Sequence, residues 1–399
     1  MVESRRSAAR FVRCLCPLIL VPVIATCGRV AGENPAAAIP IWHLEEEIRF
    51  GGVESSLDLR NALFLIPDAR VLYFAETGGR AASISETGEL LYAMGGKGDG
   101  PGEFRLPQGI QLIADTLWVL DNISGMRIEG FHDGRAAKSV RTVMQTDDGP
   151  LMPFGMNADG TILVEPRRAR NIRDIAFGLT TASALLRATR AGELLDTVVV
   201  RPVFTDDYFP VTLPAGSGAA QMPVQHSPLT RAFPDGSAVV VVDRQVASSA
   251  GGAAYRVTVH GIDSIGSRTS EIPYEPITTE PFIPIWVDQW RQRLEADGGS
   301  QDVIRVYREA MLSRLTAFPF LPPITEVRVG DEFIWLRRES LPDADSVWWD
   351  IVETGMLTRV ARVALPKNVM IAFPAEDWIW AMQNDSLDVP ELIRFRIRR

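Results

Sequence analysis

Cysteine and histidine are scarce in this sequence, and a basic surplus is absent. All three cysteines (Cys14, Cys16 and Cys27) lie within the first 27 residues, so the rest of the chain has no disulfide and no cysteine metal site. Only four histidines occur, with no H-x-H or H-E-x-x-H spacing, which argues against a zinc enzyme. The G-x-S-x-G turn of a serine nucleophile is also missing.

The charge balance excludes a further class of function. Lysine and arginine number 41 against 50 aspartates and glutamates, which gives a formal net charge of −9. A general nucleic-acid binder needs a basic face to neutralise phosphates, so we expect no nucleic-acid partner. With 46% hydrophobic and 23% charged residues, the composition is that of an ordinary folded protein.

The first 26 residues are typical of an export signal. Four arginines precede an apolar run, Leu15 to Ala25, which is too short to span a bilayer. We expect a signal peptide over 1–26, a linker over 27–40 and the folded body from 41. The residues before Cys27 resemble a lipoprotein signal, so Cys27 is a candidate for lipidation and for the chain's one attachment to a membrane. The alternative is ordinary cleavage near Ala31 or Ala36. Either route predicts an exported protein of the periplasm or cell envelope.

One short pattern recurs six times in the chain: an acidic turn residue, then a run of β-branched or aromatic residues. The acidic residues are Asp68, Asp115, Asp159, Asp235, Asp331 and Asp377. Three of the five spacings, 47, 44 and 46 residues, match the length of a four-stranded propeller blade. The other two, 76 and 96 residues, require insertions.

Each copy is typical of a β-hairpin whose second strand is buried between sheets. The aspartate supplies the tight turn, and the run after it is apolar on both faces. Third and fourth strands follow in most copies, for example Ala136 to Val143 and Leu194 to Val200. Six units of four antiparallel strands predict an all-β fold, a six-bladed β-propeller. Two stacked β-sandwiches are the alternative.

In a six-bladed propeller, the two ends of this chain can together form the last blade. Residues 365–399 provide about three strands of a last blade, and Ile41 to Phe50 can supply the fourth. Such an N-terminal strand would close the ring and remove exposed sheet edges. Within the longest insertion, Trp286, Trp290 and Leu294 share one helix face. We therefore expect a helical hairpin over 281–318, which either packs on the propeller surface or acts as a lid or docking element.

A glycine-rich loop, Gly95 to Phe104, lies between the first two units. It lacks the G-x-x-x-x-G-K-[ST] pattern and a following helix, so it is more typical of an inter-blade connection than of a phosphate loop. Together with Leu117 to Asp121 and Phe131 to Gly134, the loop resembles the repeat of NHL-type six-bladed propellers, especially exported bacterial propeller lipoproteins of unassigned function. That resemblance implies the fold. Some members of the broad class are metal-dependent lactonases or lyases and others only bind partners, so function stays open.

Loops after the second strand of each blade share a face with the inter-blade loops, and two kinds of site are conceivable there. In the last blade, Gln383 and Asn384 lie in the loop after the second strand. The first kind is a Ca²⁺-type metal site of a lactonase- or lyase-like enzyme. Its candidate ligands are Glu76, Asp121, Asn122, Glu165 and Asp243.

The second kind is an anion site made of arginines from adjacent blades. Its candidates are Arg167, Arg168, Arg244, Arg337 and Arg338, with Arg170 beside them. Guanidinium groups form bidentate bonds with carboxylate or phosphate, so these residues could hold an anionic small molecule, glycan or partner protein. The competing interpretation pairs them with Glu165, Asp174, Asp243 and Glu339 on a solvated rim. We expect a non-enzymatic binding propeller without a cofactor, with the metal-dependent enzyme as the alternative.

Overall fold

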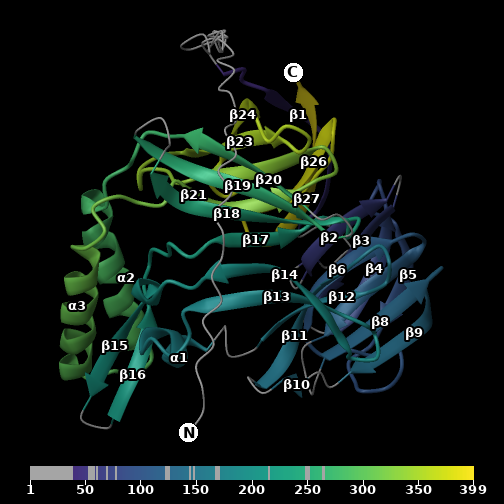
Figure 1. The fold of residues 1–399 in the computed structure, drawn as a ribbon. Coiled ribbons are helices and arrows are strands. Elements are labelled where there is room, and N and C mark those ends of the chain that lie inside the picture. The colour runs from purple at the N-terminus through teal and green to yellow at the C-terminus, as the bar shows by residue number, and fades with distance from the viewer. Residues whose placement is uncertain are drawn as a thin grey trace, which may run out of the picture. The chain divides into compact units, whose positions relative to one another are not determined.

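The structure, a computed structural model, describes residues 39–52, 59, 62–68, 71–76, 79–121, 126–142, 145–146, 149–166, 171–213, 216–247, 252–262 and 266–399. Over these ranges the chain is mostly β-strand, and six antiparallel sheets are arranged in a ring (Figure 1). The predicted six-bladed β-propeller is confirmed. None of the helices in the described ranges is both long and apolar enough to cross a membrane.

Blades 1 to 3 follow one another along the chain, each from an inner to an outer strand. Blade 1 consists of β2 (Ala62–Asp68), β3 (Val71–Glu76), β4 (Arg80–Ser85) and β5 (Leu90–Gly95). Blade 2 consists of β6 (Pro107–Ile113), β7 (Thr116–Asp121), β8 (Met126–His132) and β9 (Arg135–Thr142). Blade 3 consists of β11 (Gly149–Met156), β12 (Ile162–Pro166), β13 (Ala182–Ala188) and β14 (Leu194–Pro202), with the short β10 (Gln145–Thr146) beside β11.

Blades 4 and 5 repeat this order, and blade 6 combines both ends of the chain. Blade 4 consists of β17 (Leu229–Ala232), β18 (Ala238–Ala247), β19 (Ala253–Gly261) and β20 (Ser267–Pro273). Blade 5 consists of β21 (Ile324–Val329), β22 (Phe333–Arg338), β23 (Ser346–Glu353) and β24 (Arg359–Pro366). Blade 6 consists of β25 (Met370–Pro374), β26 (Trp378–Asn384), β27 (Pro390–Arg398) and β1 (His43–Gly51).

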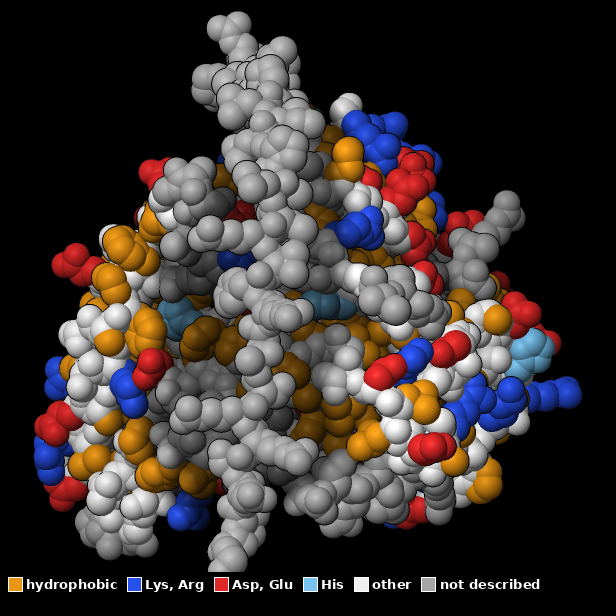
Figure 2. Space-filling model, viewed as in Figure 1, with side chains coloured by type: hydrophobic (Ala, Val, Ile, Leu, Met, Phe, Trp, Pro, Cys, Tyr) orange, Lys and Arg blue, Asp and Glu red, His pale blue; other side chains and the backbone are white. Residues whose placement is uncertain are grey.

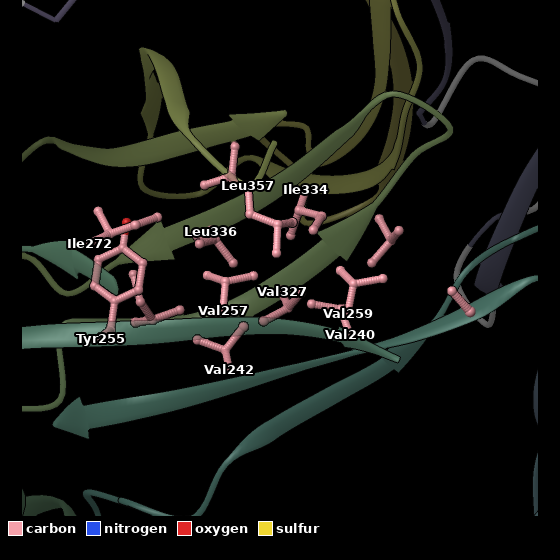
Figure 3. Close-up of a cluster of buried hydrophobic side chains, with 14 of the residues drawn as sticks. Val240, Val242, Tyr255, Val257, Val259, Ile272, Val327, Ile334, Leu336 and Leu357 are labelled. Carbon is pink, nitrogen blue, oxygen red and sulfur yellow. The ribbon is translucent and has the colours of Figure 1, made fainter. Parts of the chain in front are cut away.

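The hydrophobic core is divided among the contacts between neighbouring blades. In the part of the chain that the structure describes, every blade shares a cluster of buried apolar side chains with the next. Between blades 4 and 5, Val240 and Val257 face Ile334 and Leu336 (Figure 3). Between blades 6 and 1, Trp380 packs with residues of the first blade such as Phe74, which closes the ring.

The last blade is closed by the N-terminal strand, as predicted. β1 pairs antiparallel with β27 from His43 opposite Arg398 to Gly51 opposite Glu391. The two strands carry opposite charges. Glu47 Oε1 lies 2.7 Å from Arg396 Nε and its Oε2 lies 3.2 Å from Arg394 Nε. Cross-strand ion pairs therefore add to the main-chain ladder that joins the two ends.

The glycine-rich loop connects β5 of blade 1 to β6 of blade 2, as expected for an inter-blade link. The buried guanidinium of Arg127 on β8 donates to the carbonyls of Gly98, Gly100 and Glu103 and to the carboxylate of Glu129. Glu129 also accepts from the amide of Gly102 at 2.9 Å. Gly102 has φ 76°, which a side chain would strain. The loop is thus held from within blade 2.

Three insertions that are distant in sequence gather beside the ring at the left of Figure 1. They are α1 (Ile172–Ala176), the hairpin of β15 (Tyr208–Leu213) and β16 (Gly216–Gln221), and the helices α2 (Ile283–Ala296) and α3 (Gln301–Leu315). The expected helical hairpin over 281–318 is present, but its tryptophans pack on a β-hairpin that sequence reasoning did not find. Phe209 of β15 contacts both Trp290 and Tyr307, with ring centroids 6.2 Å apart in each pair.

Candidate functional site

A cleft of about 940 Å³ lies over blades 5 and 6, on the face that carries the inter-blade connections. The strand ends of β22 and β26 and the link from β24 to β25 form its walls. Its polar lining consists of Glu326, Arg337, Lys367, Asn368, Gln383, Asn384, Asp385 and Asp388. The structure therefore brings together Arg337 and the Gln383–Asn384 pair, which the sequence placed at equivalent strand ends of neighbouring blades.

Two cations stand in this cleft. Arg337 Nη1 lies 3.9 Å from Glu326 Oε2, and that carboxylate also holds Arg328 at 2.6 Å. The ammonium of Lys367 donates to the carbonyls of Leu341 and Pro342 at 3.2 and 2.9 Å. Carbonyl oxygens satisfy the donors of Lys367 without removing its charge. Glu326 is thus shared between two arginines, Arg328 and Arg337.

Glu339 links the charges of the cleft to blade 4, because it interacts electrostatically with Arg337 and Lys367 of the cleft and with Arg244 of blade 4. Burial raises the pKa of the Glu339 carboxyl, although Arg337, Lys367 and Arg244 oppose the rise. Burial also lowers the pKa of Arg244 to about 10, against the attraction of Asp207 and Glu339. Arg244 is buried and donates to the carbonyl of Ser227 at 2.8 Å. The half-buried Glu339 carboxylate thus lies within electrostatic range of Arg244, Arg337 and Lys367. We call Arg244, Arg337 and Lys367 the basic group.

The acidic residues on the blade 6 wall are occupied within their own turn. Asp385 Oδ1 accepts from the amides of Leu387 and Val389 at 2.8 and 2.9 Å. Asp388 Oδ1 accepts from the side-chain amide of Asn384 at 2.6 Å. These bonds fix the loop after β26 without removing the carboxylate charges, so this wall presents both side-chain amides and carboxylates. Amide donors and cations together favour oxygen-rich, negatively charged ligands.

Arg338 has a different environment from Arg337, its chain neighbour. Its Nη1 lies 3.7 Å from Asp350 Oδ2, in the contact between blades 4 and 5. Asp350 has no exposed surface and is also bound by Arg359 at 3.2 Å and Arg362 at 2.9 Å. Alternation along β22 places adjacent side chains on opposite faces of the sheet. Arg338 therefore belongs to an ion cluster between blades.

The candidate metal ligands that the structure describes are held separately. Glu76 is bound by Arg80, and Asp121 accepts from the amides of Arg105 and Leu106 at 3.2 and 2.9 Å. Glu165 is bound by Ser183 and Arg201. Asp243 lies 3.9 Å from Arg256, and burial raises its pKa. In the described ranges, no three histidine, cysteine, aspartate or glutamate side chains form a group that could hold a metal ion.

Several predicted residues lie outside the described ranges. They are Cys27, Asn122, Arg167, Arg168 and Arg170. The acidic partners of the described arginines also differ from those weighed on sequence grounds. Arg337 pairs with Glu326 and Arg338 with Asp350, and the expected Glu339 interacts electrostatically with the basic group.

Sequence reasoning missed Lys367 and a buried pair at the base of the β15–β16 hairpin. Asp207 Oδ1 lies 3.4 Å from His226 Nδ1, and the His226 ring stacks on Phe318 with centroids 4.2 Å apart. Asp207 also accepts from the amides of His226 and Ser227. The pair joins the inserted elements to blade 4. Because Asp207 and His226 are 19 residues apart in no known pattern, only the fold reveals them.

Comparison with known proteins does not identify a function for this chain. No protein-family model matches the chain, and no curated protein matches it.

Proposed function

We propose that this protein is a binding propeller that captures an anionic ligand in the cleft over blades 5 and 6. The observation that carries the proposal is the polar lining of this cleft. Arg337 and Lys367 supply cations, and Asn368, Gln383 and Asn384 supply side-chain amides. A cleft of about 940 Å³ falls in the size range of small-molecule sites and suits an anionic glycan or a polycarboxylate.

A binding role also agrees with the way the other charged groups are used. The buried carboxylates Glu76, Asp121 and Glu165 each stabilise their own blade. Catalysis by a metal ion would need them to converge. We therefore favour capture over catalysis.

The first test is calorimetric titration of the full chain with trigalacturonate, an anionic glycan. The fully methyl-esterified trimer is the neutral control, and inorganic phosphate distinguishes a plain anion from a glycan. We expect trigalacturonate to bind and its ester to bind at least tenfold more weakly. Equal binding of acid and ester would contradict the anionic site. Binding of phosphate alone would replace the glycan with a small inorganic anion as the ligand.

We further propose that the chain is exported and anchored through Cys27. The basic residues before an apolar run, and the absence of cysteine after Cys27, support this route. Incorporation of a labelled fatty acid into the protein should disappear in Cys27→Ser. Equal incorporation in both proteins would contradict anchoring at this residue, and release of a soluble exported form would favour cleavage near Ala31 or Ala36.

A further inference from the structure

Three arginines surround the carboxylate of Asp350 at the contact between blades 4 and 5. The Nη1 atoms of Arg338 and Arg359 lie 3.7 and 3.2 Å from its Oδ2. Nε of Arg362 lies 2.9 Å from its Oδ1. Among the residues that the structure describes, no second carboxylate lies within 4.0 Å of the nitrogen atoms of these arginines. Guanidinium groups keep their charge in proteins, so three positive charges face one negative charge. We call Arg338, Arg359 and Arg362 the arginine cluster.

The strand register places this cluster on the face of blade 5 that packs on blade 4. Asp350 pairs with Leu336 of β22 and with Arg362 of β24. Arg359 pairs with Val352, two residues further along β23. Leu336 and Val352 belong to the apolar cluster between the two blades, and directly paired residues of a sheet share a face. The cations are therefore gathered by the fold at one place, although the sequence distributes them over two strands.

The arginine cluster can be reached by a solute, whereas its carboxylate cannot. In chain order, the three arginine side chains are 14%, 16% and 32% exposed, and Asp350 has no exposed surface. In the described part of the chain, the side chains of Arg359 and Arg362 each donate one hydrogen bond, and that of Arg338 donates none. Most of their N–H groups thus remain available to a ligand. Along the rim of the face seen in Figure 2, by contrast, basic and acidic side chains intermingle.

We propose that the arginine cluster binds a phosphate group, carried by inorganic phosphate or by a phosphate monoester. Such a group has about two negative charges near neutral pH, which matches the excess of positive charge around Asp350. Guanidinium groups form paired hydrogen bonds with phosphate oxygens. Because Asp350 already holds the three arginines together, a ligand binds them with little further loss of side-chain freedom.

This site is independent of the cleft over blades 5 and 6. Alternation along β22 places the side chains of Arg337 and Arg338 on opposite faces of the sheet, and no member of the arginine cluster lines the cleft. The inference therefore does not rest on the proposed function, and each can fail without the other.

The test titrates the full chain at pH 7.5 with inorganic phosphate and with phenyl phosphate by calorimetry. Dimethyl phosphate, which keeps the tetrahedral group but carries one negative charge, is the control ligand. We expect phosphate and phenyl phosphate to bind, and dimethyl phosphate to bind at least tenfold more weakly. Tighter binding of phenyl phosphate assigns the site to a monoester, and tighter binding of phosphate assigns it to the free anion. Equal binding of dimethyl phosphate would overturn the proposal, as would no binding of either dianion.

Variants then locate the site. Arg359→Gln and Arg362→Gln each leave Asp350 with two arginines and should weaken phosphate binding at least tenfold. Arg305→Gln, on the exposed face of α3, is the matched control and should leave it unchanged. Thermal unfolding checks that each variant is folded, and the comparison of ligands on the unaltered protein does not depend on any variant. Undiminished phosphate affinity in both folded cluster variants would overturn the proposal. Loss of phosphate binding in Arg337→Gln alone would also overturn it, because the anion would then lie in the cleft.

Discussion

The phenolic oxygen of Tyr255 in blade 4 lies 2.8 Å from Oδ2 of Asp350 in blade 5. Tyr255 closes one end of the apolar cluster between these blades (Figure 3). Burial and the nearby Asp350 raise the pKa of its hydroxyl well above the ordinary value, so it remains a neutral donor. The carboxylate in turn compensates Arg338, Arg359 and Arg362. One buried anion therefore holds three cations and ties two blades together.

Replacing this anion should cost much of the protein's stability. Asp350→Asn leaves three arginines without their partner, and removing one member of a buried ion pair costs about 3–5 kcal/mol. We expect a loss of that size in the free energy of unfolding, measured with urea. Tyr255→Phe, which removes only one hydrogen bond, should cost about 1–3 kcal/mol. Asp343→Asn, on the exposed surface of the same blade, is the control. A loss below about 1 kcal/mol for Asp350→Asn would contradict the cluster's role.

The ion pairs between β1 and β27, which close the ring, should contribute a stability that depends on pH. The hydrogen bond from Arg396 lowers the pKa of Glu47 below its ordinary value of 4.5. Since the folded state holds the ionised form, this contribution is present above pH 4.5 and is lost as pH falls below it. Glu47→Gln should therefore shrink the loss of stability between pH 5.5 and 3. The pair is partly solvated, so the effect is about 0.2–1 kcal/mol.

Urea midpoints across that pH range give the measurement, and Glu309→Gln on α3 is the control. A pH profile of Glu47→Gln that is parallel to the parent's would show that the β1–β27 ion pairs add nothing to closure.

We expect the glycine-rich loop to contribute to the stability of the fold through its contacts with Arg127. Arg127→Met removes the guanidinium that holds three loop carbonyls and leaves the buried Glu129 charge without its cation. We expect about 3–5 kcal/mol of destabilisation in thermal or urea unfolding. Lys97→Ala in the same loop should change stability by less than about 0.5 kcal/mol. Similar losses in the two variants would contradict the account.

Calcium should not stabilise the fold through the predicted carboxylates. Glu76, Asp121 and Glu165 are each engaged by partners in their own blade, and a metal would have to displace those bonds. We expect the melting temperature to stay the same when millimolar CaCl₂ is added to protein treated with a chelator. MgCl₂ at equal ionic strength is the control. A rise specific to calcium would restore the metal-dependent enzyme as the better interpretation.

The repeat count was predictable because the turn aspartates and the runs after them are local signals. Asp331 before Phe333 to Leu336 predicts a buried strand by itself, and β22 covers those residues. The N-terminal strand could be assigned to the last blade because residues 365–399 supply only about three of its four strands. The β15–β16 hairpin gave no such signal. β16 (Gly216–Gln221) consists of small and polar residues, and its partner strand β15 packs against α3.

The site was predictable only where it follows the repeat. Arg337, Gln383 and Asn384 stand at equivalent strand ends, so their face could be assigned. Lys367 lies in a connection of no fixed pattern. Arg338 could not be separated from Arg337 without the pairing register. Asp350, 95 residues from Tyr255, is joined to it only by the contact between blades.

Electrostatic capture in the cleft can be tested with two variants whose charge changes have opposite sign. Trigalacturonate affinity would be measured by calorimetry for Arg337→Gln, which removes a cation, and for Glu339→Gln, which removes a carboxylate within electrostatic range of the basic group. Both should remain folded by thermal unfolding. We expect weaker binding in Arg337→Gln and tighter binding in Glu339→Gln, each by about tenfold at low salt, with the difference shrinking as salt screens it. Affinities that move in the same direction in both variants, or do not move, would contradict it.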